Sequence, residues 1–204
     1  HHLKRRKAAM RYEPDHKEET RQKVLRAAAR AIRAEGPHKI AVAKVMARAG
    51  LTHGGFYAHF ASKDDLVAAA IDQMFVEAKS RHMLETAGRD PASALGAYID
   101  FYLGQEHRDA RATGCPMPAL AADLPRLTDT ARARFAAGVQ GLRERIATLL
   151  AGLKATDPDA EASSMIAELV GALSLARAEP DPAASDLILT RSKAALKRRL
   201  NLEA

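Results

Sequence analysis

Residues 41–66, AVAKVMARAGLTHGGFYAHFASKDDL, decide the fold of this chain. Apolar residues recur there at helical spacing, at Val42, Val45, Met46 and Ala49. This spacing predicts a short helix over residues 42–49 with one apolar face. Gly50 follows directly, and glycine readily adopts the left-handed conformation that a tight turn after a helix requires. The stretch is therefore expected to begin as a helix and a turn.

A second short helix is predicted after this turn, with the Thr52 hydroxyl capping its first turn. Phe56 and Phe60 are four residues apart, so both rings are expected to point back to the core. The remaining large side chains of this segment are then left facing outward, at His53, Tyr57 and His59.

A third, longer helix is predicted to start at Ser62-Lys63-Asp64-Asp65. Ser62 is its N-cap, and Asp65, three residues later, is the reciprocal partner. Two short helices joined by a tight turn and followed by a longer one form a helix-turn-helix. The second helix of that motif can enter the major groove of DNA.

At these residues the sequence resembles the tetracycline-repressor (TetR) family of bacterial transcriptional regulators. Its Gly50-Leu51-Thr52, Phe56-Tyr57-Ala58-His59-Phe60 and Ser62-Lys63-Asp64-Asp65-Leu66 segments are similar to that family's G-[VL]-[ST], [LF]-Y-x-[HY]-F and x-K-x-x-L signature. The match runs from Thr20 to about Leu66. Ile40 and Ala41 depart from it because the family usually has hydroxyl residues there, so the first motif helix lacks its cap. Met46 replaces a usual small residue.

The resemblance implies a set of DNA contacts. It assigns phosphate contacts to Tyr57, His59 and Lys63, and base-facing positions to His53, Gly54 and Gly55. Lys44 and Thr52 are further side chains with hydrogen-bonding reach. Without the resemblance, a Tyr or His beside two Phe residues is more often part of a core. The paired glycines, which disfavour a helix by about 1 kcal/mol each, could simply be tolerated in a short helix.

Composition and charge agree with this interpretation. Alanine, leucine, arginine and acidic residues dominate, and aromatic residues make up only 4% of the chain, which favours an all-α fold. The net charge is +7. Residues 1–66 hold 15 Lys and Arg against 7 Asp and Glu, whereas residues 67–204 hold 17 against 18. A basic excess is often only a solvated face, but its confinement to the helix-turn-helix segment favours double-stranded DNA as a partner.

The chain has one cysteine, Cys115, so an internal disulfide is excluded and a reducing, cytoplasmic and nucleoid-associated location is expected. No run of about 18 apolar residues predicts a membrane span. The basic N-terminus lacks the apolar segment of a secretory signal. Lys4-Arg5-Arg6-Lys7 is predicted to be either a disordered or vector-derived tail or an arm that touches phosphates or the minor groove.

About nine helices are predicted in three segments: a basic arm at 1–16, a DNA-binding domain at 17–66 and a ligand-binding and dimerisation domain at 67–204. The first helix covers Lys17–Glu35, and the helix from Leu66 to about Thr86 links the two domains. Three Asp-Pro pairs should start helices, because aspartate caps and proline suits the first helical position. The later helices are expected at about 91–105, 119–123, 128–153, 158–178 and 182–200.

A stripe of apolar residues could line a ligand cavity between the middle helices, as the resemblance implies, although such a stripe is more often plain core. The candidates are Phe101, Tyr102, Cys115, Met117, Phe135 and Met165. A lone buried cysteine is usually a small apolar residue, and the alternative for Cys115 is an electrophile or oxidant sensor. No metal-spaced cluster, phosphate-binding glycine loop or nucleophile elbow occurs, so no cofactor is expected and an enzyme is disfavoured.

The last two predicted helices carry apolar faces that need burial. They are expected to form a bundle with a symmetry mate about a two-fold axis, giving a homodimer. The candidate interface residues are Met165, Ile166, Leu169, Val170, Leu173, Ile188, Ala195 and Leu196. The alternative is that both helices simply complete a monomeric core.

The sequence therefore predicts an all-α transcriptional regulator, most simply a repressor that a small-molecule effector releases from a palindromic operator. One alternative is an architectural DNA-binding protein without an effector. Another is a helical enzyme or carrier of small molecules.

Overall fold

The computed structural model describes the backbone of residues 2–202 and the side chains of residues 15–202, and the described residues are all-α, as predicted. The helices that carry the DNA-binding motif come first, and the two that end the chain come last. Their bounds are α1 His2–Glu35, α2 Val42–Arg48, η1 His53–Ala58, α3 Lys63–Thr86, α4 Pro91–Tyr102, α5 Gln105–Asp109, α6 Pro116–Leu120, η2 Leu124–Arg126, α7 Asp129–Gly152, α8 Pro158–Ala178 and α9 Pro182–Arg199, where η marks a 3-10 helix.

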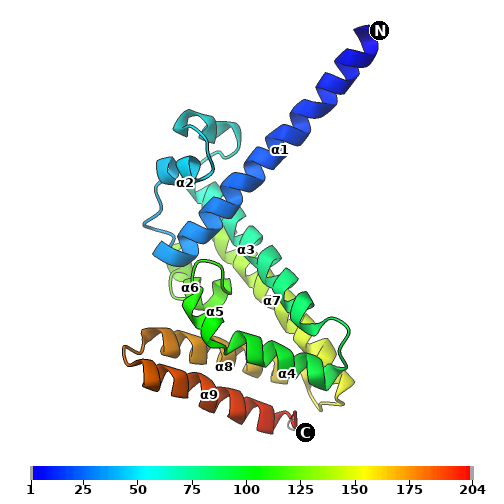
Figure 1. The fold of residues 1–204 in the computed structure, drawn as a ribbon, viewed down its shortest axis with the longest axis vertical. Coiled ribbons are helices and arrows are strands. Elements are labelled where there is room, and N and C mark those ends of the chain that lie inside the picture. The colour runs from blue at the N-terminus through cyan, green and yellow to red at the C-terminus, as the bar shows by residue number, and fades with distance from the viewer. Residues whose placement is uncertain (1, 203–204) are drawn as a thin grey trace.

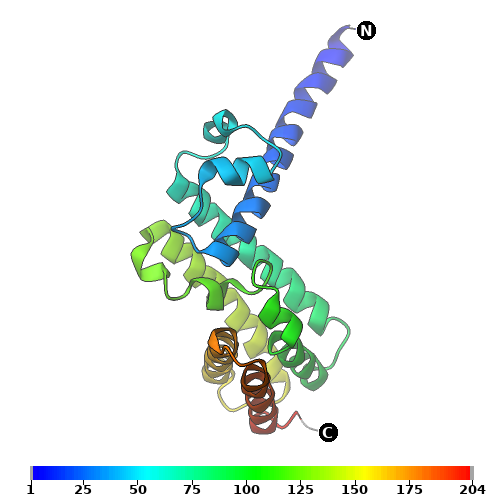
Figure 2. The ribbon, with the colours of Figure 1, turned by 60° about the vertical axis from the view of Figure 1, so that its left-hand side comes forward.

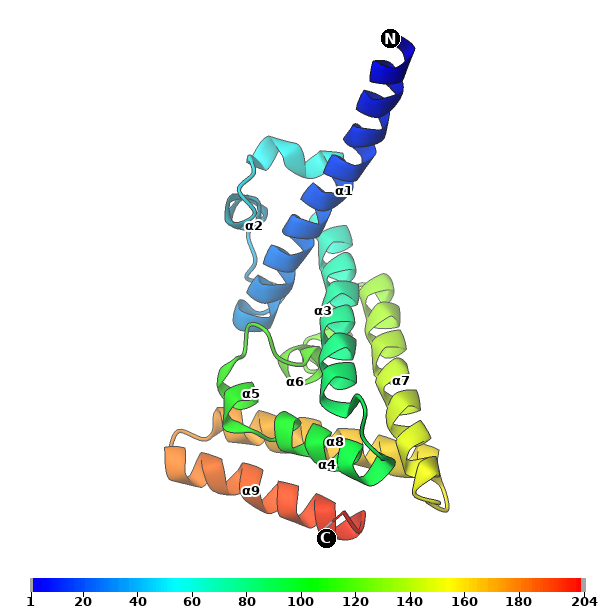
Figure 3. The same ribbon diagram turned by 45° about the vertical axis from the view of Figure 1, so that its right-hand side comes forward.

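The molecule is elongated (Figure 1). The helices α1, α2 and η1 form one end, and α4, α8 and α9 lie across the other end. The long helices α3 and α7 run side by side between the two ends (Figure 3). Seen from another side, α8 and α9 are antiparallel neighbours that close the lower end (Figure 2). The helix α3 therefore connects the DNA-binding motif to the rest of the chain, as the sequence predicted.

Helix starts follow the predicted capping chemistry. The carboxylates of Asp90, Asp157 and Asp181 each accept a backbone N–H from the first turn of α4, α8 and α9, and a proline follows each of them. Thr128 caps α7 in the same way. The side chain of Ser62 accepts the N–H of Asp65, whose carboxylate accepts the N–H of Ala61. These bonds satisfy donors that a helix end leaves without partners.

Four local predictions were wrong. The first helix begins at His2 and not at Lys17, so the backbone of the expected arm at Lys4–Lys7 is helical, and its side chains lie outside the described residues. The segment after the motif turn is a six-residue 3-10 helix, and the Thr52 hydroxyl makes no cap bond. The helix α4 ends at Tyr102 instead of Gln105, and α6 starts at Pro116 instead of Ala119. The prolines at 116 and 118 favour a helix start there, because proline suits a first turn.

The interior consists of two hydrophobic clusters that meet at two aromatic rings. One cluster joins α1, α2, η1 and the first half of α3, and the other joins α4, α7, α8 and α9. Phe75 of α3 and Phe135 of α7 pack against both clusters and contact each other edge to face, with ring centroids 5.4 Å apart. These two rings therefore join the two halves of the molecule.

Gly138 of α7 lies directly under Phe75. A Cβ atom added at Gly138 would lie 2.3 Å from the Phe75 ring, closer than any van der Waals contact. The absence of a side chain at this position lets α3 and α7 approach each other. The packing of the two long helices thus depends on a single glycine.

We predict that Gly138→Ala lowers the free energy of unfolding by about 1–3 kcal/mol, because the new methyl group overpacks the Phe75 contact. Gly96→Ala is the matched control, since Gly96 also lies within a helix but has open space around it. That variant should gain up to about 1 kcal/mol from helix propensity. Urea unfolding at one protein concentration measures both. Phe75→Leu should restore part of the loss in the Gly138→Ala background; equal effects of the two alanines would contradict the proposed contact.

Candidate nucleic-acid interface and internal cavity

In the helix-turn-helix, one exposed aromatic side chain lies beside a buried pair of aromatic rings. Phe56 and Phe60 are each only 2% exposed and stack with ring centroids 5.7 Å apart. The guanidinium of Arg21 covers the Phe60 ring at 4.9 Å, which fixes η1 against α1. Tyr57 is 74% exposed, and its ring stands edge-on to Phe56 at 5.2 Å. The two phenylalanines face the core as predicted, and Tyr57 faces solvent.

His59 and Lys63 lie at the turn between η1 and α3. His59 is half-buried, and its Nδ1 has no hydrogen-bond partner among the described residues. Burial, followed by the nearby positive charges of Lys17 and Arg21, lowers the pKa of His59. The Lys63 ammonium donates a hydrogen bond to the backbone oxygen of His38, at 3.3 Å. The loop after α1 therefore holds Lys63 in position, whereas His59 lies near the charged residues of α1 without a hydrogen bond from Nδ1.

The other predicted DNA-contact residues lie on the same motif. Lys44, Thr52, His53 and Gly54 are exposed, while Gly55 is half-buried. A Cβ atom at Gly55 would meet the Met46 side chain at 3.7 Å, an ordinary contact, and at Gly54 it would meet nothing. The structure thus brings all eight predicted residues together between α2 and the start of α3, and their contacts with DNA remain predictions.

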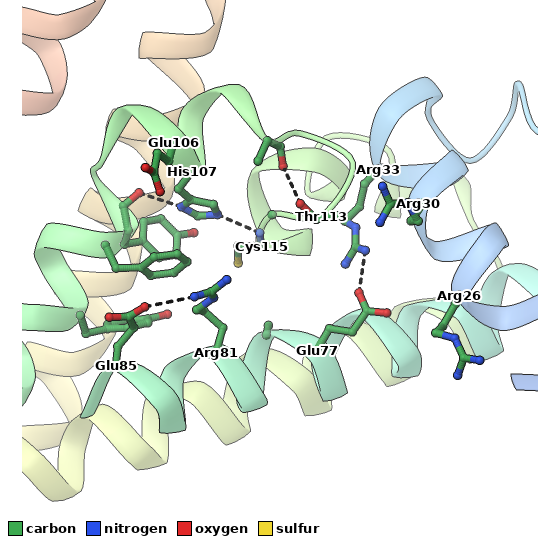
Figure 4. Close-up of a pocket in the computed structure, with 16 residues that line it drawn as sticks. Arg26, Arg30, Arg33, Glu77, Arg81, Glu85, Glu106, His107, Thr113 and Cys115 are labelled. Carbon is green, nitrogen blue, oxygen red and sulfur yellow. Dashed lines mark hydrogen bonds and ion pairs between the residues drawn. The ribbon is translucent and has the colours of Figure 1, made fainter. Parts of the chain in front are cut away.

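A cavity of about 460 Å³ lies between the end of α1 and the helices α3, α4 and α5. Its walls come from α1, α3, α4, α5 and the loop at residues 110–115 (Figure 4). The volume is within the range of about 300–1,000 Å³ that small-molecule sites occupy. Four arginines and three glutamates line it: Arg26, Arg30, Arg33, Arg81, Glu77, Glu85 and Glu106. The cavity therefore has a charged side, formed largely by α1 and α3.

Arg33 joins three elements at this cavity. Its side chain is 1% exposed, its Nη2 donates to Glu77 of α3 at 2.6 Å, and its Nε donates to the backbone oxygen of Ala112 at 2.8 Å. The remaining nitrogen, Nη1, is buried and has no partner among the described residues. Arg33 thus fastens α1 to α3 and to the 110–115 loop.

His107 organises the opposite side of the cavity. Its Nε2 accepts the backbone N–H of Cys115 at 3.0 Å, so the ring proton is on Nδ1, which donates to the Tyr102 backbone oxygen at 2.8 Å. Burial lowers the pKa of His107 to about 4, so the ring is neutral at pH 7. Its ring stacks on Phe101 at 4.9 Å and meets Tyr102 edge-on at 4.8 Å. This side is therefore largely aromatic, and Glu106, beside His107 on α5, is its charged group (Figure 4).

Comparison with known proteins connects both features to one family. Residues 24–70 match the model of the bacterial regulatory proteins of the tetR family, and residues 91–191 match that of the tetracyclin repressor-like C-terminal domain. The chain belongs to the TetR family. It is thus a DNA-binding transcriptional regulator by family, and the resemblance seen in the sequence is confirmed.

Solved structures agree with this assignment. A TetR transcriptional regulator from Chloroflexus aurantiacus J-10-FL has 27% identity and a TM-score of 0.78, with 92% of this TetR chain and 96% of that chain covered. A TetR-family regulator from Agrobacterium tumefaciens has 27% identity and a TM-score of 0.74, covering 89% and 98%. The reduced form of E. coli NemR shares the fold, at 20% identity, a TM-score of 0.77 and coverage of 88% and 96%. No curated protein matches the chain.

Three of the six predicted ligand residues of this TetR protein line the cavity, namely Phe101, Tyr102 and Cys115. Met117 and Met165 are buried in the cluster of the C-terminal half, and Phe135 packs on Phe75. Burial raises the pKa of the Cys115 thiol, which keeps it protonated, whereas the thiolate is the reactive form.

The sequence reasoning missed the arginines of α1, because they contribute to the cavity only through contacts between residues far apart in the chain. Arg33 is 44 residues from Glu77 and 79 from Ala112. The one available signal in the sequence was the position of Arg33, which directly follows Ile32 on the apolar side of α1. In the structure Arg33 is itself only 3% exposed.

The predicted dimer stripe lies largely inside this chain. Its buried members, at most 7% exposed, are Met165, Ile166, Leu169, Leu173 and Leu196. Val170 and Ile188 are half-buried, and Ala195 is exposed. The physical reason is that α4, α6, α7 and α9 all pack on α8 and occupy its apolar face. Only the last three residues are open to a partner.

Among the described residues no helix is long and apolar enough to span a membrane, and no group of three His, Cys, Asp or Glu side chains could hold a metal ion.

A second buried histidine, His82, lies behind the cavity wall. It is 3% exposed, neither ring nitrogen has a partner among the described residues, and its ring meets that of Tyr98 edge-on at 4.6 Å. Burial, with a smaller contribution from Arg145, lowers the pKa of His82 to about 4. The surroundings of His82 offer its ring nitrogens no hydrogen-bond partner among the described residues, so they suit an apolar aromatic ring better than an imidazole.

We predict that His82→Phe makes the protein less sensitive to acid. The pKa of about 4 for His82 in the folded protein lies below the ordinary histidine pKa of about 6.5, so the unfolded chain binds more protons between these values. The part of the stability that depends on uncharged His82 is therefore fully present above about pH 6.5 and is lost as the pH falls toward 4. Between pH 8 and pH 5 the variant should lose about 1–2 kcal/mol less free energy of unfolding than the parent.

Urea titrations at both pH values measure this difference. His16→Gln is the control, because His16 is exposed and should leave the pH dependence unchanged. A His82→Phe variant with the parent's acid sensitivity would show that another group dominates.

Proposed function

We propose that this protein is a repressor that binds a palindromic operator as a homodimer and is released when a small molecule occupies the cavity. The observation that carries the proposal is that one cavity is lined both by α1, which supports the helix-turn-helix, and by α3, α4 and α5. A molecule in that space touches the DNA-binding part and the remainder of the chain together. This favours a regulator with an effector over an architectural protein without one.

For DNA contact, the proposal rests on the exposed residues of the motif. Tyr57 and Lys63 are placed to meet phosphates, while His53 at the start of η1 and Lys44 on α2 can approach base edges. Gly54 and Gly55 let the backbone of η1 come close to the groove, because neither has a side chain to keep it away. Phosphate contacts position a protein on DNA, whereas base contacts give sequence preference.

For release, the proposal uses α3 as the mechanical link. The helix is held to α1 by Arg33 and Glu77 and to α7 by Phe75 and Gly138. A ligand that alters the first contact moves α1 relative to α3 and so changes the separation of the two motifs in a dimer. Half-sites must lie about 34–36 Å apart, or a multiple of that, for both motifs to dock.

For the dimer, the outward face of α8 is the proposed contact. Its accessible residues are small or apolar: Ala160, Ser164, Ala167, Gly171, Ser174, Leu175 and Ala178. Leu175 of α8 and Leu187 of α9 are 63% and 47% exposed. Together with Val170, Ile188 and Ala195 of the predicted interface, they supply apolar surface for a two-fold bundle. Small side chains let two such helices approach closely.

The DNA contacts are tested by three variants against a set of operator sequences. Lys63→Ala and Tyr57→Phe should weaken binding to all sequences alike, and Lys63→Ala should reduce the salt slope by about 0.9 because one phosphate contact is lost. His53→Ala should instead change the preference among bases. Fluorescence anisotropy with labelled DNA at several salt concentrations measures both properties.

Lys79→Ala is the control, because Lys79 is exposed on α3 beyond the motif. An unchanged salt slope in Lys63→Ala would remove the phosphate role, and an unchanged preference in His53→Ala would remove the base role.

The dimer is tested with Ala167→Glu and Gly171→Glu combined. Ala167 is exposed and Gly171 has open space beyond its Cβ position, so the chain itself should fold normally. Across a two-fold axis the four carboxylates would repel. We expect a monomer with unchanged helical circular dichroism and an operator affinity at least about 100-fold weaker, since the two half-sites are no longer bound together.

Sedimentation at micromolar concentration measures the oligomeric state. Ala151→Glu, on an exposed position at the end of α7, is the control and should leave it unchanged. A double variant that sediments as a dimer and keeps its operator affinity would place the interface elsewhere.

A further inference from the structure

We infer that the cavity binds a small carboxylate with an apolar, preferably aromatic, body, and that its carboxylate is held by Arg33. This inference rests on the proposed function, because it names the chemical class of the effector. It begins from the atoms that the fold leaves without partners.

One buried atom at this cavity is a hydrogen-bond donor without a partner. Arg33 Nη1 is fully enclosed, and it has no acceptor among the described residues. A buried guanidinium nitrogen without an acceptor is costly, more so than a neutral group. The cavity therefore lacks an acceptor, and the acceptor that best matches a guanidinium is a carboxylate.

The charges around Arg33 favour an anion as well. Arg81 of α3 projects into the same space, where it lies over the Phe101 ring at 5.0 Å and contacts Glu85 at 3.3 Å (Figure 4). Glu77 is already occupied by Arg33 and by Gln73. Arg30 lines the cavity and makes no ion pair among residues 15–202. With Glu106 included, four arginines line the cavity against three glutamates, so the positive groups exceed the negative ones by one, and the neutral His107 does not change the balance.

The opposite side of the cavity selects the body of the ligand. Phe101 and His107 are stacked there, and Tyr102 stands edge-on to His107. Cys115 adds an uncharged thiol to this wall. Flat apolar groups pack well on such rings. A molecule with a carboxylate at one end and an aryl group at the other satisfies both sides.

The position of Arg33 also couples ligand binding in the cavity to the DNA-binding domain. The same guanidinium holds Glu77 on α3 and the Ala112 oxygen in the loop. A carboxylate on Nη1 competes electrostatically with Glu77 for one charge. Occupation of the cavity thereby loosens the Arg33–Glu77 pair that joins α1 to α3.

The test compares carboxylates with their uncharged amides in calorimetric titrations of the full chain. The probe pairs are benzoate with benzamide, trans-cinnamate with cinnamamide, and hexanoate with hexanamide. We expect at least one carboxylate to bind at least about tenfold more tightly than its amide, a difference of about 1.4 kcal/mol, with the aryl acids ahead of hexanoate. If no carboxylate outbinds its amide, the inference is wrong.

Three variants assign the effect to residues. Arg33→Lys should weaken the carboxylates about tenfold and leave the amides unchanged, because an ammonium lacks the planar fork. Glu77→Gln should strengthen the carboxylates several-fold, because it removes the competing charge. Arg132→Gln, on an exposed arginine of α7 paired only with Asp129, should change neither. A Glu77→Gln variant that weakens carboxylates and amides alike would reduce Glu77 to a structural role and overturn the inference.

Glu77 is 31% exposed, so Glu77→Gln keeps the test decisive even if Arg33→Lys does not fold. Operator binding by the ligand-free parent is measured separately. If the parent binds DNA but prefers no carboxylate, only the ligand class is wrong. If the parent binds no DNA, the proposed function fails whatever the titrations show.

Discussion

The ring of Phe75 on the bare backbone of Gly138 is the contact on which the architecture depends. It lies where the two hydrophobic clusters meet, and it sets how closely α3 and α7 approach. Phe75 is half-buried, and its ring packs on Phe135 and on the backbone at Gly138. Because protein interiors are densely packed, this contact opposes sliding of α3 along α7.

Arg33 forms a contact of another kind. The Phe75 contact is apolar and does not respond to charge, whereas the contact between α1 and α3 at Arg33 is an ion pair with one guanidinium nitrogen left over. Breaking a buried ion pair by removing one partner is strongly unfavourable, but exchanging one carboxylate for another is not. The junction between α3 and α7 is thus apolar at Phe75, whereas the junction between α1 and α3 combines apolar packing with one buried ion pair.

The sequence predicted the features that depend on neighbouring residues. The caps by Ser62, Asp90, Asp157 and Asp181 connect groups two to four positions apart, so the pattern alone was sufficient. The outward Tyr57 between two inward phenylalanines followed from a similar argument. The 3-10 geometry of η1 did not follow, because the choice between two helix types in a six-residue segment rests on its packing against α1 and α2.

Features that depend on distant residues were not predictable in this way. The apolar stripe of α8 looked like an interface because the sequence does not show that α4, α6, α7 and α9 all cover it. An apolar stripe in a sequence indicates only that one face of the helix must be buried. It does not indicate whether the same chain or a second copy of it covers that face. For a related reason the sequence pointed to only part of the cavity lining. Phe101, Tyr102 and Cys115 are close together in the sequence, whereas Arg33 is distant in the chain and lines the same cavity from α1.

The two ends of the molecule are separated by the length of α3. Because α3 is long, a small change of its angle at one end gives a large displacement at the other end. A helix of 24 residues is about 36 Å long. The motif lies at one end of α3, and the residues of α3 that line the cavity, Glu77 to Glu85, lie toward its other end (Figure 1). At 1.5 Å per residue the distance from these residues to the start of α3 is about 21–33 Å, so a tilt of about 5° at the cavity would displace the motif by about 2–3 Å. This displacement approaches the rise of one base pair, which is about 3.4 Å. An exchange of partners at Arg33 therefore needs to move α1 only slightly to bring one motif out of register with its half-site. Under the proposed function, a cavity that is lined by both α1 and α3, and by the residue that joins them, is a position from which a small ligand alters the placement of the motif.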